Sequence, residues 1–160
     1  MQELSIVEQA FAWRSRPAWP LEAPALFPQE IAVLRWIWGL DWRDLDCHSI
    51  EANHDVVFLL PPEAFCFYLP GFICAGIRER RADLLVTTSL IQMLDRSPDS
   101  AAWDAFFAER WPLLTRPECN AVEAWIWWLS ASGDDGRPDD DSLTRSLGTV
   151  DLLRSGGGLS

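Results

Sequence analysis

The sequence contains no lysine, only two histidines and one tyrosine in its 160 residues. Its thirteen basic residues are all arginine and are outnumbered by 24 acidic residues, which gives a formal net charge of −11. Affinity for nucleic acid comes from basic patches against phosphates, and the one concentrated patch here, residues 78–81, also contains a glutamate. The charge balance therefore predicts no nucleic-acid partner. It favours a basic protein partner, although the same charge also serves to keep a chain with ten tryptophans in solution.

Recognisable catalytic motifs are also lacking. The sequence has no glycine-rich phosphate loop, no H-E-x-x-H or G-x-S-x-G motif and no C-x-x-C pair. The four cysteines are widely spaced, which is typical of buried free thiols rather than of a disulfide framework. Cys47 and His48 are neighbours, but adjacent side chains on a helix point about 100° apart and would not meet as nucleophile and base. We therefore expect no catalytic residue, no cofactor and no metal site.

The longest apolar run, residues 56–77, is too interrupted to span a membrane. A spanning helix needs roughly 20 consecutive apolar residues, whereas this run contains Glu63 and several prolines. The first residues, MQELSIVEQAF, carry acids where a secretory signal carries bases. The sequence therefore predicts a protein without membrane insertion and with a cytoplasmic location.

The apolar segment of residues 61–77, PPEAFCFYLPGFICAGI, predicts the central helix of the core. Its Pro-Pro-Glu start suits a first helical turn, where a missing amide costs nothing and a carboxylate faces the positive end of the helix dipole. Apolar residues from Phe65 onward recur at spacings of three and four, which places them on one side of a helix. Pro70 removes a backbone donor, so we expect a kink there or two short helices in sequence. The helices that contain Phe106 and Ile126 should pack against this one.

Helical spacing recurs along the rest of the first 132 residues. It predicts further helices over residues 5–14, 29–40, 41–52, 84–94, 103–111 and 119–130. Two capping boxes, Ser5–Glu8 and Thr115–Glu118, should begin helices. Prolines between residues 17 and 28 predict an extended connection that packs on the domain, and residues 56–60 are either a short strand or a buried link. The pattern predicts an all-α or mainly α fold, a single compact multi-helix domain over residues 1–132.

Residues 133–160 differ in composition from the preceding chain. They are rich in glycine, serine and aspartate, as in GDDGRPDDD, which is typical of a mobile acidic linker. Leu143, Leu147 and Val150 have the spacing of a weak amphipathic helix. We expect a flexible acidic C-terminal tail with a possible short helix, and we expect the domain to stay folded without it.

Several segments together resemble an uncharacterised bacterial protein family, a domain of unknown function. They are I-V-E-Q-A-F near the start, D-W-R-D-L at residues 41–45 and L-L-P-P-E-A-F-C-F-Y-L-P at residues 59–70. The last is similar to the family's L-T-P-E-A-F-x-Y-Y-L-P-A-F-L segment, and residues 114–129 resemble its later L-T-x-x-Q helix. This chain departs from the pattern at Pro61, Phe67, Gly71 and Glu118. The resemblance implies one fold over roughly residues 6–129 and brings with it no activity and no catalytic residue.

Trp42 lies among Asp41, Asp44 and Asp46, and these four residues are the candidate protein-binding site. An aromatic anchor within an acidic rim suits a basic partner. Alternatively Trp42 packs beneath its own helix, because large aromatic side chains are mostly buried. The carboxylates could also gather around a divalent cation with His48, but a capped, solvated helix start explains them as well. Further tryptophans fall where the apolar stripes leave a face or edge open, namely Trp13, Trp19, Trp36 and Trp127.

Two functions from different classes remain open at this point. The first is a non-catalytic acidic binding protein, for example an immunity-type inhibitor that masks a basic toxin or enzyme. The second is a small enzyme of unknown reaction whose site combines scattered carboxylates with His48 or His54. A pocket that converges on either histidine would favour the enzyme, whereas an acidic surface with an exposed aromatic would favour the binding protein. We expect the binding protein, and the oligomeric state stays open.

Overall fold

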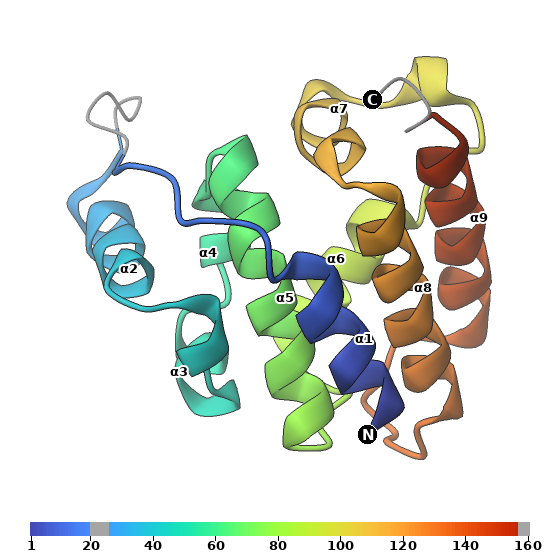
Figure 1. Ribbon diagram of the computed structural model, residues 1–160, viewed down its shortest axis with the longest axis horizontal. Coiled ribbons are helices and arrows are strands. Elements are labelled where there is room, and N and C mark those ends of the chain that lie inside the picture. Colours follow the sequence, from blue (N-terminus) through green and yellow to red (C-terminus); the bar gives the residue numbers. More distant parts are fainter. Residues whose placement is uncertain (20–25, 157–160) are drawn as a thin grey trace.

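The computed structural model describes residues 1–19 and 26–156, and every regular element in this part of the chain is a helix (Figure 1). The prediction of an all-α fold with one hydrophobic core is confirmed. The α-helices are α1 (Gln2–Phe11), α2 (Pro28–Trp38), α3 (Cys47–Ala52), α4 (Val56–Leu59), α5 (Pro62–Arg78), α6 (Leu85–Leu94), α7 (Ala105–Arg110), α8 (Arg116–Ala131) and α9 (Asp140–Gly156). Three 3-10 turns join them, η1 (Trp42–Asp44), η2 (Ser100–Ala102) and η3 (Trp111–Leu113).

Helix α5 is the centre of the core, as its apolar sequence predicts. Every residue from Ala64 to Ile77 is buried, and Phe65 is fully buried with its ring centroid 5.3 Å from that of Trp111. The helix continues through Pro70, so the alternative of two short helices is wrong. Pro70 has no amide hydrogen, and the carbonyl of Cys66 therefore lacks its usual helical donor. A kink at this position stays a prediction.

The neighbours of α5 are only partly those expected. Helix α7, which contains Phe106, contacts α5, and this prediction is confirmed. Helix α8, which contains Ile126, packs mainly on α1 and α9 instead. Figure 1 shows α1 between α5 and α8. Helix α1 contacts each of them and takes the place of the direct contact expected between α5 and α8.

A buried ion pair joins α1 to the start of α8. Arg14, just beyond the end of α1, donates from Nη2 to Oε1 of Glu118 at 2.8 Å, and its Nε contacts the other carboxylate oxygen. Glu118 is completely buried and also accepts the amide of Thr115 at 2.8 Å. The Thr115–Glu118 capping box is therefore confirmed, and it contributes to a tertiary contact as well as to a helix start.

One local prediction is wrong, and one of two alternatives left open is ruled out. Helix α1 begins at Gln2, so Ser5 and Glu8 lie inside the helix instead of capping it. The apolar run at residues 56–60 forms the single helical turn α4 rather than a strand, and the amide of Leu60 bonds to the carbonyl of Val56 at 3.2 Å. A run this short has no periodicity that separates strand from helix, so tertiary packing decides its conformation.

The separate flexible tail expected from Gly133 requires the main correction. Residues 140–156 form α9, a helix much longer than the one expected, which packs on α6 and α8 (Figure 1). Leu143, Val150 and Leu153 are buried in this contact. The boundary between residues 132 and 133 is therefore not the edge of the hydrophobic core, and a mobile linker stays a prediction only for residues 133–139.

The connection between α1 and α2 is described only at its two ends. Trp19 and Leu26 are half-buried against the core, as expected, whereas Phe27 is 68% exposed. The Trp19 ring meets that of Trp38 edge to face, with centroids 5.2 Å apart. Pro20, Leu21 and Pro24, which belong to the predicted extended connection, lie outside the described residues, as do residues 157–160 of the predicted tail.

Candidate functional site

Trp42 is not the exposed anchor that its acidic neighbours suggest. Its side chain is only 1% exposed and packs beneath η1 against α5, so the alternative interpretation holds. The guanidinium of Arg43 covers the indole at 4.3 Å from the ring centroid. A partner protein therefore has no access to Trp42.

The helix predicted over residues 41–52 is divided into η1 and α3, and two of the three aspartates around Trp42 begin these helices. Asp41 accepts the amide of Arg43 at 2.9 Å and also pairs with the guanidinium of Arg43. Asp46 accepts the amide of Ser49 at 2.8 Å and caps α3. Asp44 is exposed and makes no such contact in the described structure. The capping role predicted for this segment thus accounts for Asp41 and Asp46, and Asp44 is the aspartate left entirely to solvent.

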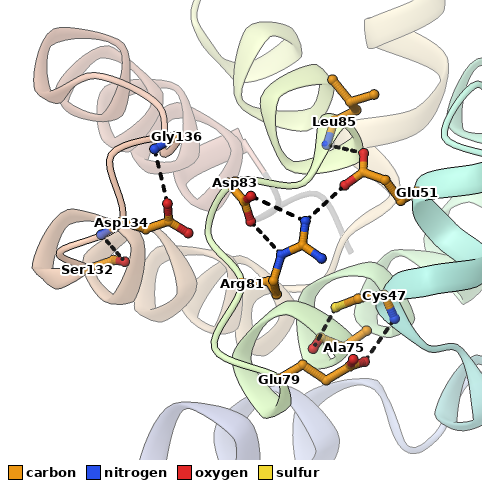
Figure 2. A network of polar contacts seen from close by, with 10 residues as sticks. All are labelled: Cys47, Glu51, Ala75, Glu79, Arg81, Asp83, Leu85, Ser132, Asp134 and Gly136. Carbon is orange, nitrogen blue, oxygen red and sulfur yellow. Dashed lines mark hydrogen bonds and ion pairs between the residues drawn. The ribbon is translucent and has the colours of Figure 1, made fainter.

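The structure brings together a different group of acidic residues around Arg81, in the link between α5 and α6 (Figure 2). Nε of Arg81 donates to Oδ1 of Asp83 at 2.7 Å, and Nη2 reaches Oε2 of Glu51 at 3.3 Å. Glu79, from the C-terminus of α5, accepts the amide of Cys47 at 2.8 Å. We define the Arg81 cluster as these residues together with Asp134 from the link between α8 and α9: Glu51, Glu79, Arg81, Asp83 and Asp134. It contains four carboxylates and one guanidinium.

The α8–α9 link completes the cluster. Asp134 accepts the amide of Gly136 at 3.1 Å, which forms a tight turn beside Asp83. A Cβ atom on Gly136 would lie only 2.7 Å from Cβ of Asp83, so this close approach requires glycine. Acidic residues from α3, the α5–α6 link and the α8–α9 link are thereby brought to one surface. They are far apart in the sequence, and no local motif signals that they meet.

Within the Arg81 cluster, the guanidinium of Arg81 favours the ionised form of Asp83. The hydrogen bond from Arg81 lowers the pKa of Asp83 below its ordinary value, and burial opposes this only in part. Arg81 and Asp83 remain 41% and 36% exposed at their side chains, so both face solvent. The cluster therefore carries excess negative charge at neutral pH and is accessible to a partner.

An exposed apolar side chain stands at the edge of the cluster. The amide of Leu85, the first residue of α6, donates to Oε1 of Glu51 at 3.0 Å. The Leu85 side chain is 49% exposed, and Figure 2 shows it directed away from Arg81. The sequence predicted a helix over residues 84–94 that contains Leu85, but it gave no indication that this side chain is exposed. The combination sought at Trp42, an apolar anchor beside carboxylates, is present here instead.

Neither histidine lies in a concave site. His48 is exposed on α3, and His54 lies in the turn after it, with Nδ1 3.2 Å from Oδ1 of Asp55. Neither residue lines the principal cavities found over residues 1–19 and 26–156. The geometry that would favour an acid–base enzyme at His48 or His54 is not observed in this part of the chain.

The cysteines are buried free thiols, as predicted. Burial is the main cause that raises the pKa of Cys47, Cys66 and Cys74 to about 12 and that of Cys119 to about 11. Thiols of this kind are protonated at neutral pH and are poor nucleophiles and poor metal ligands. The described residues also contain no group of three or more His, Cys, Asp or Glu side chains placed to hold a metal ion.

The remaining tryptophan candidates divide by exposure. Trp13 and Trp127 are 63% and 57% exposed, whereas Trp19 and Trp36 are half-buried. Trp13 lies at the end of α1 beneath Arg14, and Trp127 lies on the outer face of α8. Both belong to elements other than those that form the Arg81 cluster.

No family model, curated protein or solved structure matches this chain. The resemblance to a bacterial domain of unknown function therefore stays a prediction. Among the described residues, no helix has both the length and the apolar character that crossing a membrane requires.

Proposed function

We propose that this protein is a non-catalytic binding protein whose partner is a basic protein. The partner would dock on the Arg81 cluster. We propose that Asp44 and Asp46 belong to the same docking surface, because Cys47, the residue after Asp46, donates its amide to Glu79 of the cluster. The observation that supports this proposal best is the exposed Leu85 at the edge of four carboxylates, because protein interfaces combine an apolar centre with a charged rim. The net charge of −11 also favours a basic partner.

An immunity-type inhibitor of a basic toxin or enzyme is the specific form of this function that we propose. Such an inhibitor needs a stable scaffold and a charged surface, and it needs no chemistry of its own. The buried α5 supplies the first and the Arg81 cluster the second. For the competing proposal, an enzyme that uses His48 or His54, neither histidine lines the principal cavities of the part of the chain that the structure describes.

The experiment begins with affinity capture from the native host and continues with the purified captured protein. Association and dissociation rates would be measured at several salt concentrations. Asp44→Arg and Asp135→Arg reverse exposed charges outside the cluster on the proposed docking surface, Asp135 being the residue after Asp134, and both should slow association, most strongly at low salt. Leu85→Ala should act mainly on dissociation, since it removes buried apolar contact. Glu109→Arg makes the same charge change on α7 and serves as the control.

Slower association for Asp44→Arg and Asp135→Arg, with Glu109→Arg close to wild type, supports the proposal. Equal rates for all three reversals, or a captured partner that is itself acidic, would show that this surface is not the binding site.

A further inference from the structure

A shallow apolar groove lies beside α6, next to the Arg81 cluster. It has a volume of about 400 Å³ and is lined by side chains of α4, α6, α7 and the α6–α7 link. The lining residues are Phe58, Ser89, Gln92, Met93, Arg96, Asp104 and Phe106. The ring centroids of Phe58 and Phe106 are 6.3 Å apart, which makes them a joined aromatic wall.

The groove and the cluster are parts of one surface along α6. Leu85, Ser89 and Gln92 follow one another at spacings of four and three, so they occupy one face of the helix. Leu85 at the cluster and Gln92 in the groove are seven residues apart, or about 10 Å along the axis. Leu85 and Phe58 are each 49% exposed, so this face offers apolar side chains at both the cluster and the groove.

Charge is distributed unequally along this face. At one end lie Glu51 and Asp83 of the cluster, with an excess of carboxylates. At the other end Arg96 pairs with Asp104 at 3.3 Å, and its guanidinium lies 4.0 Å from the Phe107 ring centroid, so that end carries no excess of negative charge. A docked segment is therefore favoured in one direction, with its basic end at the cluster and its apolar side chains in the groove.

We infer that this face is the docking site for a basic amphipathic helix of the partner, a conclusion that rests on the proposed function and specifies the element recognised. Two turns of a helix span the distance from the cluster to the groove, so an Arg or Lys at one position and an apolar residue seven positions away meet both. A basic helix is favoured over an acidic one because its positive charges complement the excess carboxylates of the cluster. Leu85 and Phe58 supply the apolar contact.

The test adds each of three synthetic helical peptides to the isotopically labelled full chain. Changes in the amide chemical shifts of the chain show where each peptide binds. The first peptide combines leucine and lysine in amphipathic spacing, the second replaces lysine by glutamate, and the third replaces leucine by serine. The leucine–lysine peptide should shift amides of residues 85–92, Phe58 and the cluster. The leucine–glutamate peptide should not bind there, because its charges oppose those of Glu51 and Asp83.

Phe58→Ala should weaken binding of the leucine–lysine peptide about tenfold, the effect of losing one buried aromatic contact. Leu113→Ala is the matched control, because Leu113 is 46% exposed on η3, away from this face, and it should leave binding unchanged. Circular dichroism of both variants checks that they fold. Both positions are surface-exposed, so neither change should unfold the chain.

The outcomes separate this inference from the proposed function. Two of the peptides are basic, the leucine–lysine peptide and the one with serine in place of leucine. If both shift the cluster amides but Phe58→Ala binds the leucine–lysine peptide as tightly as wild type, the groove is not part of the site and the inference is overturned. If neither basic peptide perturbs the cluster, the proposed acidic docking surface itself is wrong. If the leucine–glutamate peptide binds the groove as well as the leucine–lysine peptide does, charge does not select the docked helix, and the inference of a basic helix is overturned.

Discussion

Gly71→Ala should destabilise the protein even though the same change in most helices stabilises it. Gly71 lies in the middle of α5, where alanine is favoured over glycine by about 1 kcal/mol. A Cβ atom here, however, would lie 2.7 Å from the carbonyl oxygen of Trp42 and 2.6 Å from Cδ1 of Leu45. The first of these is backbone, so η1 has to move away from α5 to admit one methyl group.

Overpacking a close contact of this kind typically costs about 1–3 kcal/mol, and the propensity gain of about 1 kcal/mol is subtracted from this cost. The expected net effect is therefore a loss of up to about 2 kcal/mol. For a chain of this length, each kcal/mol lowers the melting temperature by about 2–4 °C. Urea unfolding, followed by circular dichroism and by tryptophan fluorescence, measures the change directly.

Gly148→Ala is the matched control, because Gly148 also lies inside a long helix but has no atom within 4 Å of the added Cβ. This variant should gain up to about 1 kcal/mol. Equal or greater stability for Gly71→Ala than for wild type would refute the reasoning, since it would mean that η1 does not pack closely on α5.

Four further outcomes are expected. Glu118→Ala should lower the free energy of unfolding in urea by about 3–5 kcal/mol, because it leaves the Arg14 guanidinium buried without its carboxylate. Glu123→Ala, at a partly exposed pair with Arg154, is the control and should lower it by at most about 1 kcal/mol. The hydrogen bond from Arg145 lowers the pKa of Asp95 in the folded protein. The ionised carboxyl therefore stabilises the fold above its unfolded pKa of about 3.9, and this stabilisation is lost as pH falls through the lower folded pKa. Asp95→Asn should be less stable than wild type at neutral pH, and the difference in stability should disappear in acid. Truncation after Gly133 should lower the melting temperature markedly, because α9 covers apolar surface of α6 and α8, and an unchanged melting temperature would show that α9 is not docked. The four buried thiols should react with iodoacetamide in urea but hardly at all in the native protein at neutral pH, and rapid native labelling would contradict their burial.

Local patterns in the sequence determined the type and approximate position of most elements. The start of α5 at Pro62 and the capping box of α8 at Thr115 both follow from the chemistry of a few neighbouring residues. The burial of α5 also follows from sequence, because a segment that is apolar on every side has no face for solvent. These features depend on interactions within about one helical turn or on composition.

Tertiary contacts decided the rest. Trp42 stands among aspartates yet is buried, because Gly71 on α5 leaves room for η1 to approach. Residues 140–156 have the composition of a linker, and only the presence of α6 and α8 gives their few apolar side chains a surface to cover. The Arg81 cluster joins three segments separated by up to about half of the chain, and no spacing rule connects Glu51 with Asp134. Local sequence therefore sets the position of most helices and the burial of α5, whereas tertiary contacts dock α9 on the core and bring distant carboxylates together at the exposed start of α6.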